Sequence, residues 1–176
     1  MKRNAATTGA LVRNWNMALL VGILFATPVT FAVGGPGGTD RPQLGTCDTV
    51  IPPPPASFPA VVEIGLTCRF RHLGLTAGTL TQVIDAAGPP SNGVLPLTIS
   101  QGVIAYIAAN GDALHATFEG EGSIDFATGT IAFEGIETYA GGTGRFADAS
   151  GTSFLEGHAS AVTLTGFYVT LGTLSY

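Results

Sequence analysis

The sequence predicts an all-β protein, an antiparallel closed barrel of about eight strands over residues 60–176. Short runs rich in Val, Ile, Thr and Phe alternate there with glycine-containing turns, as in strands of a sandwich or barrel. No segment shows the sustained 3.6-residue apolar period of an amphipathic helix. A unit of Phe or Leu, Glu and Gly also recurs in successive runs, which favours strands that bend to close a barrel.

The predicted strands follow one another at short spacing. Gly88–Gly93 (GPPSNG) and the Asn-Gly-Asp run at 110–112 are turn signals between them. The strands are expected at 60–75, 79–86, 94–100, 103–109, 113–126, 129–140, 151–164 and 166–176.

The repeated unit predicts which side chains face outward. Its copies are Phe118-Glu119-Gly120, Phe133-Glu134-Gly135 and Leu155-Glu156-Gly157, with Leu164-Thr165-Gly166 as a weaker fourth. Side chains alternate along a strand, so each Glu is expected on the face opposite its Phe or Leu. Glycine inside a strand is destabilising, so recurrence suggests a geometric need. The alternative is chance, because glycine is abundant, with 25 in the chain. If the copies are real, Glu119 and Glu134 are near neighbours and one pKa is raised.

The first 32 residues read as a secretory signal peptide. Lys2, Arg3 and Arg13 precede the apolar run MALLVGILFA, and small residues lead to an expected cut after Ala32. A membrane anchor is the alternative, but the run is shorter than the ~20 residues of a spanning helix. We therefore expect a secreted or periplasmic protein.

Residues 33–59 are predicted to form a Gly/Pro-rich irregular arm, because proline lacks the amide donor of a sheet ladder. Cys47 lies in this arm and Cys68 in the next run. In an oxidising compartment the pair favours a disulfide that pins the arm to the barrel, with free thiols or a metal pair as alternatives.

The charge excludes polyanionic partners. After removal of residues 1–32, four arginines remain against twelve acids, a net charge of −8. Phosphates repel such a chain, so we expect no nucleic acid partner and, after signal cleavage, no membrane partner.

The stretch YAGGTGRFADASG at residues 139–151 admits two interpretations. Its GTGRFA segment matches the G-x-G-x-x-A form of a dinucleotide fingerprint, which requires a following helix of several turns. Only one turn fits before the next strand-like run. We therefore interpret the stretch as a barrel corner, in which Gly141, Gly142 and Gly144 supply unusual backbone angles, Phe146 plugs one barrel end, and Arg145 bonds strand-end carbonyls or Asp148.

The same residues carry a family resemblance. GGTGRFADASG resembles the hallmark GGTGRF-x-x-A-x-G of dirigent proteins and the wider allene oxide cyclase barrel superfamily. The runs GDALHATFEGEG, FEGIETYAGGTGRF and GTLSY are similar to secreted bacterial members. The resemblance covers residues 60–176 and is strongest over 111–157. It implies an eight-stranded antiparallel barrel with an internal cavity, often in trimers, and assigns no catalytic or ligand-binding residue.

Other chemistry finds little support. His72, His115 and His158 lack paired metal-ligand spacing, so no metal site is expected. No G-x-S-x-G elbow occurs, and the only lysine, Lys2, lies in the signal, so neither a nucleophile nor a cofactor is expected. Five carboxylates lie close together in the sequence: Glu119, Glu121, Asp125, Glu134 and Glu137. Two carboxylates that face each other can act as an acid–base pair or bind calcium, but we interpret these five as a solvated strand face.

Three functions remain open. The first is a non-catalytic binding or scaffold protein whose barrel holds a small hydrophobic molecule or is filled by side chains. The second is an isomerase or cyclase on an apolar substrate, with an inward carboxylate. The third is an oligomeric surface component, a homotrimer formed through apolar strand faces. We expect the first rather than an enzyme.

Overall fold

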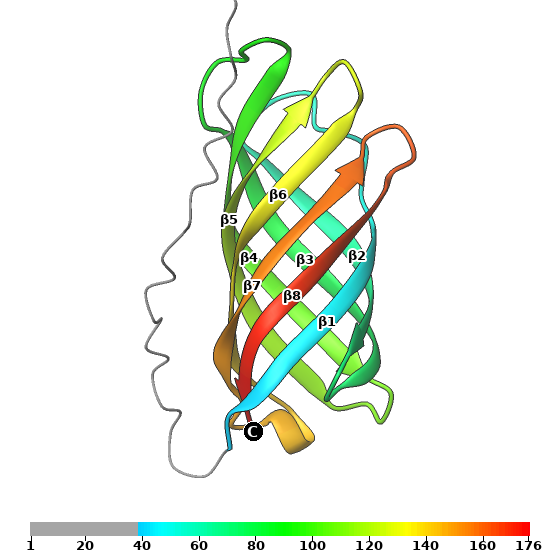
Figure 1. Cartoon of the computed structure of the whole chain (residues 1–176), viewed down its shortest axis with the longest axis vertical. Helices are drawn as coiled ribbons and strands as arrows, with labels where there is room; N and C mark the ends of the chain where they lie inside the picture. The colour runs from blue at the N-terminus through cyan, green and yellow to red at the C-terminus, as the bar shows by residue number, and fades with distance from the viewer. Residues whose placement is uncertain (1–38) are drawn as a thin grey trace, which may run out of the picture. The chain divides into compact units, whose positions relative to one another are not determined.

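The computed structural model describes residues 39–176, and these form a closed antiparallel β-barrel (Figure 1). Strands pair in chain order, and the last strand pairs back to the first. This confirms the predicted fold class. The predicted signal peptide and its cut after Ala32 lie outside the described residues. No helix of residues 39–176 has the length and hydropathy that a membrane span requires.

Each strand alternates buried and exposed side chains, as expected for a wall with one apolar face. One short 3-10 helix, η1 (Gly144–Phe146), interrupts the described strands. The strands are β1 (Arg41–Val50), β2 (Ala60–Phe70), β3 (Gly74–Ala86), β4 (Val94–Ala108), β5 (Ala113–Asp125), β6 (Thr130–Gly142), β7 (Ser150–Ser160) and β8 (Thr165–Ser175).

Two predicted runs, 94–100 and 103–109, are one continuous strand, β4. The break in the sequence pattern is a β-bulge, because the register shifts against both β3 and β5 near this point. Gln101 has φ 53° there, a left-handed backbone conformation. The bulge bends β4 without ending it.

The predicted irregular arm at 33–59 is wrong for Arg41–Val50, which form β1. Pro42 and Gly45 read as breakers, yet the segment alternates buried and exposed residues along its length. Pro42 lies near the start of the strand, where a missing amide is tolerated. The segment Ile51–Pro59 contains four consecutive prolines and no strand residue, so here the prediction of irregular structure is correct.

The barrel has two distinct ends (Figure 1). At one end lie η1, the C-terminus and the turns β2–β3 and β4–β5; we call this the corner end. At the other end lie the β1–β2 connection (51–59) and the turns β3–β4, β5–β6 and β7–β8. We call the connection 51–59 the cap and this end the capped end.

Cys47 and Cys68 form a disulfide, as predicted, with an S–S distance of 2.04 Å. The bond does not pin an arm, because the two residues are direct register partners on β1 and β2. Both are fully buried, and 21 positions separate them in sequence. In the chain-entropy model a loop of this size stabilises the fold by about 3 kcal/mol.

The glycines of the repeated unit lie where neighbouring strands approach too closely for a side chain. Gly120 of β5 and Gly135 of β6 are register partners. A Cβ atom at Gly120 would overlap the backbone carbonyl oxygen of Glu134, and one at Gly135 would overlap that of Glu119. The glycines therefore permit the close inward curvature of β5 and β6.

Gly120→Ala is expected to destabilise the barrel by about 1–3 kcal/mol, because a backbone carbonyl cannot move aside as a flexible side chain can. Urea unfolding measures the change. Gly65→Ala is the matched control: Gly65 is an exposed strand glycine whose added Cβ would meet nothing closer than 3.9 Å. That variant is expected to gain about 0.5–1 kcal/mol. Equal effects of the two substitutions would contradict the curvature argument.

Candidate functional site

The glycine-rich corner closes one end of the barrel. Gly141 and Gly144 have φ values of 79° and 56°, which favour glycine. Phe146 is fully buried in the main core and packs edge-on against Tyr176, with ring centroids 5.0 Å apart. Only three residues separate the short η1 from β7, so the long helix that a dinucleotide fingerprint requires is missing at this position.

Arg145 binds a different acid from the one expected. Its Nε lies 3.8 Å from the Asp112 carboxylate, and its guanidinium stacks 4.6 Å above the Phe146 ring. The Asp112 carboxylate also accepts a hydrogen bond from the Arg145 amide, at 3.3 Å. The predicted partner Asp148 is not involved, because the β4–β5 turn and the corner meet at the same barrel end. The unusual backbone angle expected at Gly142 is wrong, because Gly142 does not have a positive φ. Gly142 pairs with Leu114 at the end of β6, where an added Cβ would overlap the Ala113 carbonyl oxygen.

The three histidines lie on separate elements. His115 and His158 are exposed on β5 and β7, and His72 contacts the Pro42 carbonyl oxygen from the β2–β3 turn, at 3.0 Å. Within residues 39–176 no three His, Cys, Asp or Glu side chains gather in a metal-binding arrangement.

A buried polar cluster occupies the barrel interior, centred on Glu137 of β6. Glu137 is 0% exposed, and Tyr106 of β4 donates a hydrogen bond to its Oε1. Thr170 of β8 and Tyr139 donate to Oε2, at 3.2 and 3.3 Å. Tyr168 of β8 joins the cluster through the Tyr106 hydroxyl, at 3.0 Å. We call these five residues the Glu137 cluster.

Burial shifts the ionisation of this cluster toward neutral groups. It raises the pKa of the Glu137 carboxyl, and the hydrogen bonds from Tyr106, Thr170 and Tyr139 offset part of that rise. Burial, and next the nearby Glu137 charge, raise the pKa of Tyr106, Tyr139 and Tyr168 well above the ordinary tyrosine value. Burial therefore disfavours the charged form of each of these groups.

The expectation that Glu137 is one of the solvated carboxylates is wrong, because its side chain is buried. Glu119, Glu121 and Glu134 are exposed as expected, and Asp125 is partly exposed at the end of β5. Glu137 follows Gly135 by two positions and Phe133 by four, and both of those residues face inward. Strand alternation therefore predicts that Glu137 also faces inward. Glu134 lies three positions before Glu137, so alternation places it on the opposite face. It does face outward, beside its register partners Glu121 and Glu156.

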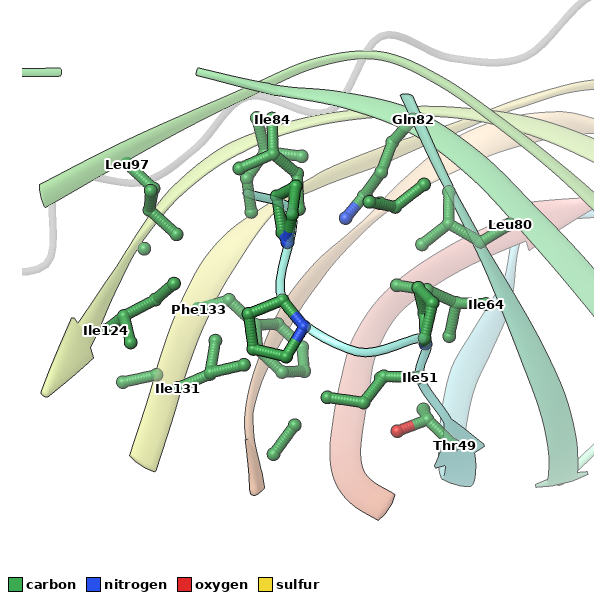
Figure 2. A pocket seen from close by; sticks show the side chains of 18 of the residues that line it. Thr49, Ile51, Ile64, Leu80, Gln82, Ile84, Leu97, Ile124, Ile131 and Phe133 are labelled. Atoms are coloured by element: carbon green, nitrogen blue, oxygen red, sulfur yellow. The ribbon is translucent and has the colours of Figure 1, made fainter. Parts of the chain in front are cut away.

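An apolar cavity of about 80 Å³ is shown in Figure 2. Its lining extends from Tyr168 of the Glu137 cluster to the cap. Phe118, Leu155 and Tyr168 belong both to its lining and to the main core. Toward the cap its wall includes Leu97 and Ile124, which form a second buried cluster with Leu95. Apart from the hydroxyl of Tyr168, the polar side chains of the lining are Thr49 and Gln82.

The cap lies over this cavity. The four consecutive prolines 52–55 line it, together with Ile51 and Phe58. The Ile51 amide donates a 3.0 Å hydrogen bond to the Leu164 carbonyl in the β7–β8 turn. Phe58 packs against the second buried cluster. The cap is thus anchored at both of its ends, and proline limits its backbone freedom in between.

Searches against protein-family models, curated proteins and solved structures find no match to this chain.

Glu137→Gln is expected to remove a pH dependence of stability. A carboxyl whose pKa is higher in the folded state stabilises fully below its unfolded pKa, about 4.3. That stabilisation is lost as the pH rises from there through the folded pKa, at about 1.4 kcal/mol per unit of pKa difference. Glutamine has the same shape and no charge, so the wild-type stability should decline over this window relative to the variant. Urea unfolding from pH 4 to 8 measures the difference.

Glu63→Gln is the control for that series, since Glu63 is an exposed carboxylate on β2. It should leave the wild-type pH profile unchanged. Parallel profiles for wild type and Glu137→Gln would show that Glu137 ionises as easily inside the barrel as in the unfolded chain.

Proposed function

We propose that this chain is a secreted or periplasmic barrel protein that holds a small apolar molecule in the cavity beneath the cap, without a reaction of its own. The observation that carries the proposal is the cavity itself, which is lined by apolar side chains and by the four prolines of the cap. Concave, mostly apolar sites with few polar groups are typical of small-molecule binding. The resemblance of GGTGRFADASG to the dirigent and allene oxide cyclase-like motif supports the same use of a barrel.

The size of the cavity limits the ligand. Its volume of about 80 Å³ is several times the roughly 10–15 Å³ that one water needs. It is well below the roughly 300–1,000 Å³ of sites for drug-sized molecules. A compact hydrocarbon-like molecule, or the apolar end of a longer one, therefore fits better than a large cofactor.

An isomerase or cyclase is the second candidate, and Glu137 is the observation that favours it. Tyr168 lines the cavity and reaches Glu137 through the Tyr106 hydroxyl. Glu137 itself does not line the cavity, and its carboxyl oxygens already accept three hydrogen bonds from protein hydroxyls. A general base must come within hydrogen-bond reach of its substrate. This arrangement supports binding over catalysis.

The disulfide and the charge support the proposed compartment. A buried disulfide is stable in oxidising compartments and rare in the cytosol, which supports export by the predicted signal of residues 1–32. The net charge of −8 that remains after cleavage supports an extracellular or periplasmic role away from nucleic acids and anionic membranes.

Protein purified from its host under native conditions is expected to retain a small molecule, detected as a mass increment by native mass spectrometry. Leu80 is buried and lines the cavity, so Leu80→Phe places a ring in the ligand volume and should abolish the increment. Val103 is 60% exposed on the outer face of β4, next to Ile104, which pairs with Leu80. Val103→Phe is therefore the matched control and should keep the increment.

Retention by Leu80→Phe at the wild-type level would place the molecule elsewhere. A wild-type protein with no increment, and with no response of its cavity side chains to added apolar molecules, would end the binding proposal.

The outer wall supports self-association. Ile136, Phe154, Leu171 and Leu44 are successive register partners across β6, β7, β8 and β1, and all are exposed. This row forms a continuous apolar strip, and exposed apolar patches mark interaction sites. Because the family resemblance implies trimers, we propose a homotrimer assembled through this strip.

Light scattering on the purified wild-type protein is expected to give the mass of three chains. The double variant Phe154→Ser, Leu171→Ser removes the centre of the strip and should give a monomer, because its apolar contribution to association is lost. Val61→Ser, on the exposed face of β2, is the control and should leave the mass unchanged. A monomeric wild type would contradict the proposal.

A further inference from the structure

A polar side chain points into the cavity from an apolar stretch of its wall. Gln82 of β3 is 4% exposed, and Figure 2 shows its amide nitrogen directed into the cavity. An amide nitrogen is a hydrogen-bond donor with two N–H groups. Buried polar groups in folded proteins are nearly always hydrogen-bonded, because an unpaired one is unfavourable. The nitrogen of Gln82 therefore requires an acceptor on its cavity side.

The wall next to Gln82 is made of hydrocarbon side chains. Leu80 and Ile84 precede and follow it on the same face of β3, and its register partner on β2 is Val62. All three line the cavity. On the other side, the ladder to β4 is interrupted at Gln82, where the register shifts. None of these neighbouring side chains can accept a hydrogen bond from the amide.

The other polar side-chain atoms of the lining are enclosed or already bonded. Gln82 Oε1 and Thr49 Oγ1 are buried by surrounding protein atoms, and neither has a hydrogen-bond partner among residues 39–176. The Tyr168 hydroxyl lies 3.0 Å from the Tyr106 hydroxyl and hydrogen-bonds to it. The Gln82 nitrogen is therefore the side-chain group best placed to meet a molecule in the cavity.

The lining also limits which acceptor can enter. No lining residue carries a carboxylate, an ammonium, a guanidinium or an imidazole. A carboxylate would accept the hydrogen bond, but it would be desolvated without a counter-charge. An alcohol would bring a donor of its own into the cavity, where Gln82 Oε1 and Thr49 Oγ1 are enclosed. A carbonyl oxygen accepts hydrogen bonds and brings neither a charge nor a donor.

We infer that the ligand is a small, neutral carbonyl compound whose oxygen accepts a hydrogen bond from Gln82 Nε2 while its apolar body fills the cavity. This inference rests on the proposed binding function and names its ligand class. Gln82 then acts as the specificity-determining residue, because a site with a buried donor discriminates against ligands that lack the acceptor.

Three small, neutral ring compounds test the inference. Cyclopentanone carries a carbonyl acceptor, methylenecyclopentane has a methylene group in place of that oxygen, and pyrrole carries an N–H donor. Binding is followed by the NMR shifts of isoleucine methyl groups on the cavity wall, such as Ile64, Ile84 and Ile99. Each probe is compared between wild type and variant, so that differences in the hydration of the free probes cancel.

Gln82→Met keeps the length of the side chain and removes its donor. It is expected to weaken the binding of cyclopentanone about tenfold, because the carbonyl oxygen is then buried without a partner. The affinities for methylenecyclopentane and pyrrole should not fall, since neither compound offers an acceptor oxygen to Gln82. Gln82→Leu should give the same pattern if the methionine variant folds poorly.

Gln43→Met is the matched control, because it removes a buried amide that does not line the cavity. It should leave the affinities for all three probes unchanged. The carbonyl stretching frequency of bound cyclopentanone gives a second readout that does not depend on affinity. In wild type it should lie below its value in an alkane solvent, because the oxygen accepts a hydrogen bond. In Gln82→Met it should return to the alkane value.

The outcomes separate this inference from the binding function. The carbonyl inference is overturned, while the cavity remains a binding site, if Gln82→Met weakens pyrrole instead of cyclopentanone, weakens all three probes alike or weakens none. A carbonyl frequency at the alkane value in wild type would overturn it as well. If none of the probes shifts the cavity methyl groups of wild type, the binding function itself is wrong.

Discussion

Closure of the sheet by the β1–β8 ladder is the constraint on which the molecule depends. The ladder runs from the pair Arg41–Leu174 to the pair Val50–Thr165, and it gives every strand of the described barrel a neighbour on both sides. A closed wall has no free strand edge, and it divides the side chains of each strand into an inner and an outer set. That division places Glu137 inside and its near neighbour Glu134 outside. The glycines at the inner surface are the local condition for closure, because they allow strands such as β5 and β6 to curve toward each other.

The interior that closure creates has two halves of different chemistry. Toward the corner end, the Glu137 cluster satisfies a buried carboxyl with hydroxyl donors from three strands. Toward the capped end, the cavity is almost wholly apolar. Tyr168 belongs to both, since its ring lines the cavity and its hydroxyl bonds Tyr106. A polar cluster with satisfied hydrogen bonds fixes side-chain positions, so the Glu137 cluster forms a rigid boundary on one side of the apolar half.

Strand alternation and turn residues were enough to predict the all-β class and the outward Glu119, Glu134 and Glu156. The disulfide was predicted from the oxidising compartment of an exported protein alone. Local composition gave the wrong prediction for Arg41–Val50, because Pro42 and Gly45 are typical of irregular segments. These residues form β1 because β2 and β8 pair with it on either side. The candidate site was beyond the sequence for the same reason. Glu137 has the inward parity of β6, but two of its three hydroxyl partners come from β4 and β8. Gln82 and Thr49 line one cavity only after the barrel has closed.

The position of the disulfide gives the cap a topological property. Cys47 lies on β1 before the cap and Cys68 on β2 after it, so the sulfur bond and the intervening chain form a covalent ring that contains the cap. A single peptide-bond cleavage among the prolines would open that ring but leave both fragments joined through sulfur. The nicked molecule would keep β1 and β2 in register, and the two fragments would separate only under reducing conditions.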